Sequence, residues 1–261
     1  MNWSAIDLSI LGPALIAGLL VTATHVPLGQ RVLQRGIIFL DLAIAQVAGL
    51  GLIMAYSIGW EPGGWLVQLV TMSAAIVGVL LLYYTDKHWP QIQEALIGSL
   101  FVLASSGSIL LLATNPHGGD QLKELLAGQI LWVGFDQIMP VAILYSAILF
   151  LWFGYARRAN SLVFYLLFAL TITASVQLVG VYLVFASLIL PALAIRNMPK
   201  YALVYGYIVS ATGYVLGLVM AAIFDLPAGA IIVYSLALTA ILFTGYWKVT
   251  GKVQFKELPG D

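Results

Sequence analysis

Apolar residues run through the chain in long stretches, and short polar stretches between them hold most of the charged side chains. A helix needs about 20 apolar residues to cross a bilayer. Lipid offers the backbone no hydrogen-bond partners, so such stretches are expected to be helices, and the alternation typical of a membrane barrel is missing. The pattern predicts apolar helices at residues 8–28, 37–58, 64–84, 94–113, 138–156, 161–195, 202–223 and 229–247.

The stretch 161–195 differs from the others in length. At about 1.5 Å per residue, one helix of this length would measure roughly 50 Å, too long for a single crossing. Gly180 interrupts it, and Pro191 stands near its end. We therefore expect a broken element, in which one helix enters, the chain turns near Gly180, and a shorter helix returns. Non-helical backbone at that depth must be surrounded by protein or by a water-filled cavity, so the break suggests a translocation route.

Basic residues indicate the orientation, because they are enriched in cytoplasmic loops. An out-and-back path for 161–195 places all the Lys and Arg clusters inside and predicts roughly nine passages, with an external N-terminus and an internal C-terminus. Treating 161–195 as one span gives about eight passages and violates the rule in several loops. The clusters are Arg31 with Arg35, Lys87, Arg157 with Arg158, Arg196 with Lys200, and Lys248 with Lys252 and Lys256.

Composition supports an all-α polytopic transmembrane bundle in a single domain, residues 1–261. Only 8% of the residues are charged and mean hydropathy is +1.01, whereas soluble domains carry about a quarter charged residues. Formal net charge is zero, which gives nucleic-acid binding no electrostatic support. Cysteine is absent, excluding disulfides and thiolate sites. The first apolar stretch follows no Lys or Arg, so we expect a retained span rather than a cleavable signal peptide.

The sequence lacks the motifs of a metalloprotease, a serine hydrolase or a phosphate-binding loop. We therefore expect a transport subunit rather than an enzyme, and any ATP-driven transport needs a separate ATPase. An ion- or proton-coupled secondary carrier is the alternative. Such carriers often have inverted repeats with paired broken helices, but only one broken stretch is visible here.

Ionisable residues inside apolar spans cost roughly 2.5–3.5 kcal/mol each and invite functional hypotheses. Asp41 lies early in the second stretch. It is either an interfacial carboxylate paired with Arg31 or Arg35, or part of an ion path. Gln46 lies about 140° further around the same helix. It either bonds helix to helix or contributes to the path.

Five further polar residues are weaker candidates for ion ligands or pore-lining groups. His25 ends the first stretch and is either interfacial or, as neutral imidazole, a cation ligand. His117, Asp120 and Glu124 lie in an external polar loop; carboxylate and imidazole suit Zn²⁺ or Mn²⁺, although solvation alone also explains them. Gln177, close to the break, is a candidate pore-lining group.

Three stretches follow one another across most of the chain. They are VLQRGIIFLDLAIAQVAGLG at 32–51, QEALIG at 93–98 with PHGGDQLKELLAGQILWV at 116–133, and VGVYLVFASLILPALA at 179–194. In this order they resemble the permease subunits of metal-ion ABC importers, the zinc/manganese/iron permease family. The third is also similar to the coupling region of cobalamin and siderophore permeases.

The resemblance implies a type II importer permease in the cytoplasmic (inner) membrane. It implies a homodimeric channel on two ATP-binding cassette ATPase subunits, fed by an extracytoplasmic metal-binding protein. Pro191, Arg196 and Lys200 would form the ATPase coupling region. The transported substrate would be a divalent metal ion (zinc, manganese or iron, free or chelated), with no permanently bound cofactor.

One departure from the family pattern concerns the second span. The family usually has an aspartate there and a histidine four residues later, thought to touch the ion. Aligning on Gly51 places Leu42 at the aspartate position and Gln46 at the histidine position, with Asp41 one residue early. The chain thus resembles a distinct branch with Asp and Gln in this span, and the ion is left open.

Overall fold

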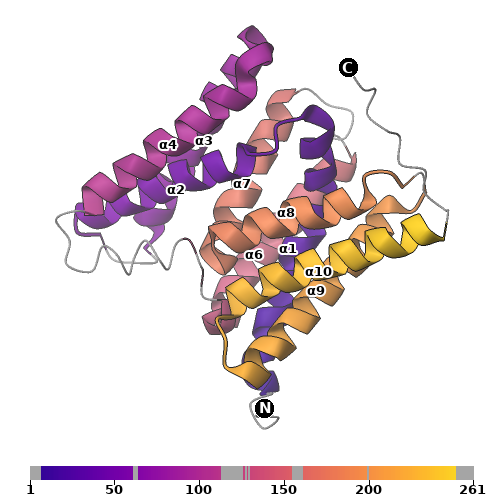
Figure 1. The fold of residues 1–261 in the computed structure, drawn as a ribbon. Helices are drawn as coiled ribbons and strands as arrows, with labels where there is room; N and C mark the ends of the chain where they lie inside the picture. Colours follow the sequence, from indigo (N-terminus) through magenta and orange to yellow (C-terminus); the bar gives the residue numbers. More distant parts are fainter. Residues whose placement is uncertain are drawn as a thin grey trace.

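The computed structural model describes residues 7–60, 64–112, 126, 128, 130–154, 161–198 and 200–250. In this part of the chain the regular structure is entirely helical (Figure 1). The helices are α1 (Leu8–Arg35), α2 (Leu40–Ser57), α3 (Trp65–His88), η2 (Pro90–Ile92), α4 (Gln93–Leu112), η3 (Ile130–Trp132), α6 (Phe135–Gly154), α7 (Ser161–Val179), α8 (Val181–Ile195), α9 (Ala202–Phe224) and α10 (Ala228–Val249).

The predicted apolar stretches correspond to these helices, so the all-α polytopic fold is confirmed. Within the described residues, 8 helices are long and apolar enough to cross a membrane, and α8 is a shorter apolar helix. The largest difference in bounds is at α1, which continues to Arg35 instead of ending near residue 28.

Pro27 lies inside α1 without ending it. A proline lacks the N–H that would bond to the carbonyl four residues earlier, here that of Ala23. The Tyr207 hydroxyl of α9 donates to this Ala23 oxygen at 3.2 Å. A neighbouring helix thus supplies the missing donor. The helix ends at Gly36, whose φ of +70° a glycine adopts without strain.

The predicted break in 161–195 is present at Gly180, which alone separates α7 from α8. Its N–H donates to the Val176 carbonyl at 2.9 Å, and its own carbonyl accepts from Val184 N–H at 3.1 Å. Helical hydrogen bonds therefore reach Gly180 from both sides. Its backbone (φ 80°, ψ 162°) lies in a region essentially restricted to glycine, which explains why the break falls here.

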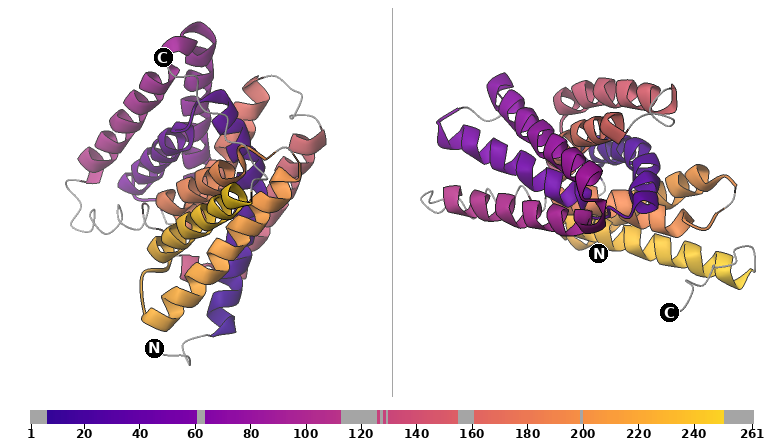
Figure 2. Two further views of the ribbon diagram at one scale, coloured as in Figure 1. Left: turned by 45° about the vertical axis from the view of Figure 1, so that its right-hand side comes forward. Right: turned by 90° about the horizontal axis from the view of Figure 1, so that it is seen from above.

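The helices form two groups joined by α7. Helices α3 and α4 pack on α2, whereas α8 and α9 pack on α1 and α10 packs on α8 and α9. Helix α7 contacts α3 and α2 as well as α1 and α8. Both views in Figure 2 keep α2, α3 and α4 on one side of the molecule, away from α9 and α10. Helix α7 is the most buried of the long helices.

Small and hydroxyl-bearing residues allow the second group to pack closely. A Cβ added at Gly29 of α1 would stand 2.1 Å from the Leu188 carbonyl oxygen of α8, so the two backbones are in direct contact. Ser187 Oγ and Tyr214 OH share a hydrogen bond of 2.7 Å between α8 and α9. Small interfacial residues and interhelical hydrogen bonds are the usual means of association between membrane helices.

The two ends of α8 lie in different surroundings. At its start, a Cβ on Gly128 would stand 2.1 Å from the Val179 carbonyl oxygen, so the loop preceding α6 touches the break. At its end, Leu193 and Arg196 lie beside Thr244 and Trp247 in the last turns of α10. Helix α8 therefore runs back from the loop end of the bundle to the end where α10 finishes, as the out-and-back prediction requires.

Candidate translocation path and coupling turn

Asp41 and Gln46 are buried side chains of α2, exposed by 1% and 2% respectively. Within the described residues, neither carboxylate oxygen of Asp41 nor the amide oxygen of Gln46 has a hydrogen-bond partner. An unsatisfied buried polar atom is costly, and an unpaired buried charge more so. These atoms therefore mark a place where a further ligand, from outside this chain or from solvent, would be stabilised.

The predicted alternative, a pairing of Asp41 with Arg31 or Arg35, is absent from the described structure. The Arg35 guanidinium lies 4.6 Å from the centre of the Phe164 ring, and its Nη2 donates to Ser161 Oγ at 3.3 Å. Arg35 thus attaches α1 to the first turn of α7. Asp41 keeps its carboxylate inside the bundle without this arginine.

Two contacts hold the start of α2, and so the position of Asp41. Glu94 Oε1 of α4 accepts a hydrogen bond from Ile38 N–H at 2.7 Å. The Phe39 ring stacks on Phe185 of α8, with centroids 6.4 Å apart and planes 2° from parallel. Glu94 thus fixes the turn that leads into α2.

His25 lies well inside α1, because this helix continues to Arg35. The expectation that His25 sits at the end of the first span is therefore wrong. Its side chain is fully buried, and its Nδ1 shares a hydrogen bond of 3.1 Å with Thr24 Oγ1. Within the described residues Nε2 has no hydrogen-bond partner. His25 is thus a core histidine with one free nitrogen.

Gln177 and Thr173 of α7 differ in burial. Gln177 is exposed near the end of α7, so it does not face the interior of this protomer. Thr173 is 1% exposed, and its hydroxyl has no hydrogen-bond partner among the described residues. Sequence reasoning missed Thr173, because a threonine in an apolar stretch has no charge to draw attention. Helix α7 packs directly on α2, which carries Asp41.

The candidate metal ligands of the external loop, His117, Asp120 and Glu124, lie outside the described residues. In the described part of the chain, no group of three or more His, Cys, Asp or Glu residues could hold a metal ion. The unsatisfied oxygens of Asp41 and Gln46 are therefore too few, by themselves, for a complete site.

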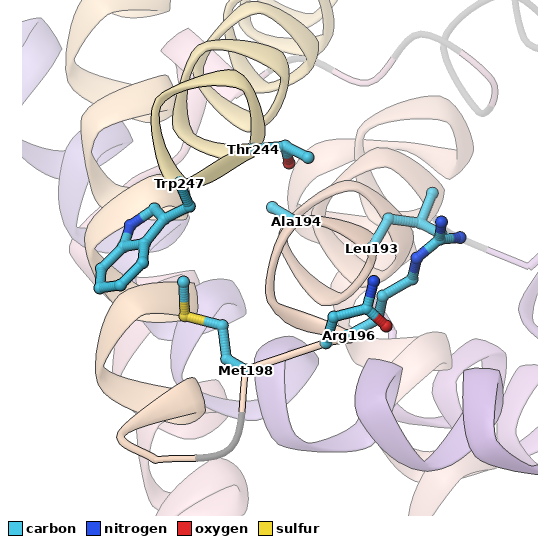
Figure 3. A pocket seen from close by; sticks show the side chains of 7 residues that line it. Leu193, Ala194, Arg196, Met198, Thr244 and Trp247 are labelled. Atoms are coloured by element: carbon cyan, nitrogen blue, oxygen red, sulfur yellow. The ribbon is translucent and has the colours of Figure 1, made fainter. Parts of the chain in front are cut away.

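The predicted coupling residues occupy the end of α8 and the turn after it. Pro191 is buried inside α8, whereas Arg196 and Lys200 are exposed. Figure 3 shows Thr244 and Trp247 of α10 facing this turn across a small pocket. The turn thus exposes basic residues and lies beside the last turns of α10.

The ABC-3 family (ABC 3 transport family) matches residues 7–164 and 154–247 of this chain. The chain belongs to this family. Its relatives include the manganese transport system membrane protein MntC of Halalkalibacterium halodurans, 26% identical over 275 residues that cover 92% of this chain and 91% of that protein. The high-affinity zinc uptake system membrane protein ZnuB of Haemophilus influenzae is 22% identical over 255 residues, covering 89% and 96%.

Among solved structures, PsaBC from Streptococcus pneumoniae in complex with Fab has the same fold. The TM-score is 0.75 at 21% identity, with 96% of this chain and 100% of that chain covered. The chain is therefore a multi-pass membrane permease of the metal-ion ABC transporter type, and its ATPase activity resides in a separate subunit. This confirms the resemblance seen in the sequence.

Proposed function

We propose that this permease imports a divalent metal ion, Mn²⁺ in preference to Zn²⁺, across the cytoplasmic membrane. The observation that carries the proposal is the buried carboxylate of Asp41, whose two oxygens have no hydrogen-bond partner within the described residues. A bound cation would supply the missing charge and the missing bonds at once.

The preference for Mn²⁺ follows from the donor atoms. Carboxylate, amide and hydroxyl oxygens suit hard cations such as Mn²⁺, whereas imidazole suits Zn²⁺. Within the described residues, the unsatisfied buried side-chain atoms of α2 and α7 are all oxygens, those of Asp41, Gln46, Tyr165 and Thr173. Where the family usually has a histidine, this chain has Gln46. The similarity to a manganese transport protein supports the same choice.

The proposed functional unit is a homodimer on two ATPase subunits, fed by an external metal-binding protein. ATP binding would move the turn at Arg196–Lys200. Because α8 connects this turn to Gly180, the movement would reach the break and open or close the path.

Transport measurements in vesicles with the ATPase inside test the proposal. The permease and its ATPase would be reconstituted with the external binding protein, and uptake of Mn²⁺, Zn²⁺, Fe²⁺ and a ferric chelate compared. We expect ATP-dependent Mn²⁺ uptake that Asp41→Asn reduces about tenfold or more. Asp7→Asn is the matched control, because Asp7 caps α1 at the exposed surface and asparagine caps equally well.

Two results would contradict the proposal. Uptake that continues without the ATPase, and that an ionophore abolishes, would identify an ion-coupled carrier instead. ATP-dependent uptake of the ferric chelate alone would keep the ABC mechanism but remove the free divalent ion as substrate.

A further inference from the structure

A pocket of about 170 Å³ lies between α1, α6 and α9, apart from the candidate path. This volume far exceeds the roughly 15 Å³ that a single water needs. Its floor is one stripe of α1, formed by Pro27, Gln30, Arg31 and Gln34, which recur at the three- and four-residue spacing of one helix face. The other lining residues are Trp152, Phe153 and Leu203.

Among the described lining residues, the polar side chains can all donate hydrogen bonds to an anion. Arg31 supplies a fixed positive charge and several N–H donors, and Gln30 and Gln34 supply amide N–H groups. Within the described residues, Arg31 makes no hydrogen bond and no ion pair. The basic group one turn further along α1, Arg35, is directed to Ser161 and Phe164 instead. An arginine fork with two amides beside it matches the oxygens of a phosphate.

The position of the pocket points to phosphate carried by lipid. It lies at the end of the bundle where α1 and α6 finish and α9 begins, the end that the basic clusters place in the cytoplasm. Helices α6 and α9 both pack on α1 and flank the pocket. Their outer surfaces carry exposed apolar side chains, Phe150 and Phe153 on α6 and Val204 and Ile208 on α9.

Trp152 is a buried, well-packed lining residue of the pocket. It is 5% exposed and packs on Phe164 of α7, with ring centroids 6.0 Å apart. Tryptophan is enriched at the membrane–water boundary, where lipid phosphates are found. Basic pockets between membrane helices on the cytoplasmic side are known to accept anionic headgroups.

We propose that this pocket binds the phosphate of an anionic phospholipid, with Arg31 as its charged anchor and Gln30 and Gln34 as further donors. The acyl chains would lie along the apolar surfaces of α6 and α9. The inference does not depend on which metal is transported or on the position of the path.

Native mass spectrometry of the purified full-length permease tests this binding. The protein in detergent would be titrated with phosphatidylglycerol, phosphatidylcholine or inorganic phosphate. We expect the wild type to prefer phosphatidylglycerol to phosphatidylcholine, and Arg31→Gln to weaken phosphatidylglycerol binding about tenfold, as expected for losing a charge-assisted hydrogen bond. Lys87→Gln is the matched control, because it removes an exposed charge near the same membrane surface on α3, and it should leave binding unchanged.

A second variant keeps the test decisive if Arg31→Gln folds poorly. Leu203→Trp would fill the pocket without altering its charge and should also weaken phosphatidylglycerol binding, with phosphatidylcholine binding unaffected. An equal loss of phosphatidylglycerol binding in Lys87→Gln would overturn the proposal. So would unchanged phosphatidylglycerol binding in both pocket variants. Displacement of phosphatidylglycerol by millimolar inorganic phosphate would identify a free phosphate site instead. Loss of ATPase co-purification in Arg31→Gln with unchanged lipid binding would make the pocket a protein contact.

Discussion

Gly128 packs directly on the backbone carbonyl of Val179, at the break between α7 and α8. Its φ of +68° favours glycine, and a Cβ there would stand 2.1 Å from that carbonyl oxygen. Gly128 is therefore in direct backbone contact with the break between α7 and α8.

Gly128→Ala should lower both stability and transport. The left-handed backbone alone costs an alanine about 1–2 kcal/mol, and the close contact adds to this. Thermal unfolding in detergent should show a loss of several degrees. Gly98→Ala is the control, because no atom lies within 4 Å of a Cβ added there. Equal stability and equal transport in the two variants would show that the contact with Val179 is unimportant.

Asp41→Asn should reduce transport without reducing stability. Removing a charged ligand should reduce Mn²⁺ uptake by about tenfold or more. Removing a buried charge without a partner should leave the melting temperature unchanged or raise it. Uptake and thermal unfolding would be measured on the same preparation. A destabilised variant with full uptake would show that Asp41 serves the fold.

Gln46→His should move the metal preference toward zinc. The substitution introduces an imidazole, which suits Zn²⁺ better than an amide oxygen does. The ratio of Zn²⁺ to Mn²⁺ uptake should rise severalfold, and Gln46→Ala should lower uptake of both. An unchanged ratio in Gln46→His would place Gln46 away from the ion.

Arg196→Ala combined with Lys200→Ala should uncouple the ATPase. These exposed basic residues follow α8, and their loss should reduce metal-stimulated ATP hydrolysis in the reconstituted complex severalfold. The permease itself should melt at its normal temperature, because neither side chain is buried. Lys87→Ala, at the same end of the bundle on α3, is the comparison and should retain stimulation. Full stimulation in the double variant would move the coupling contact elsewhere.

Tyr214→Phe should cost a small amount of stability. It removes the hydrogen bond to Ser187 between α9 and α8, and such bonds in membrane proteins contribute about 0.6 kcal/mol on average. The melting temperature should fall by about 1–3 °C. Tyr182→Phe, at an exposed position of α8, should leave it unchanged.

The helical spans and the break could be predicted because they depend on local properties. The apolar stretches set the helices, and Gly180 interrupts a stretch that exceeds one crossing. The end of α1 could not be placed, because a proline at position 27 ordinarily argues against a continuing helix. Tyr207, far away in the sequence, supplies the donor that this proline lacks.

The candidate site was only partly predictable, for a similar reason. Asp41 stood out as a charge in an apolar stretch, but its distance from Arg35 depends on how α1 and α7 pack. Thr173 and the contact of Glu94 with Ile38 are tertiary features without a sequence signal. Gln177 was chosen for its closeness to Gly180 along the chain, which does not determine the face that it occupies.

At Gly29, which is in direct contact with the Leu188 carbonyl, no side chain separates the backbones of α1 and α8. Sliding these helices past each other would require their backbones to separate first. During transport, α1 and α8 should therefore move together as one rigid body, and bending should be concentrated at Gly180. A spectroscopic distance between labels on α1 and α8 should stay constant through the ATP cycle, while distances from α8 to α7 change.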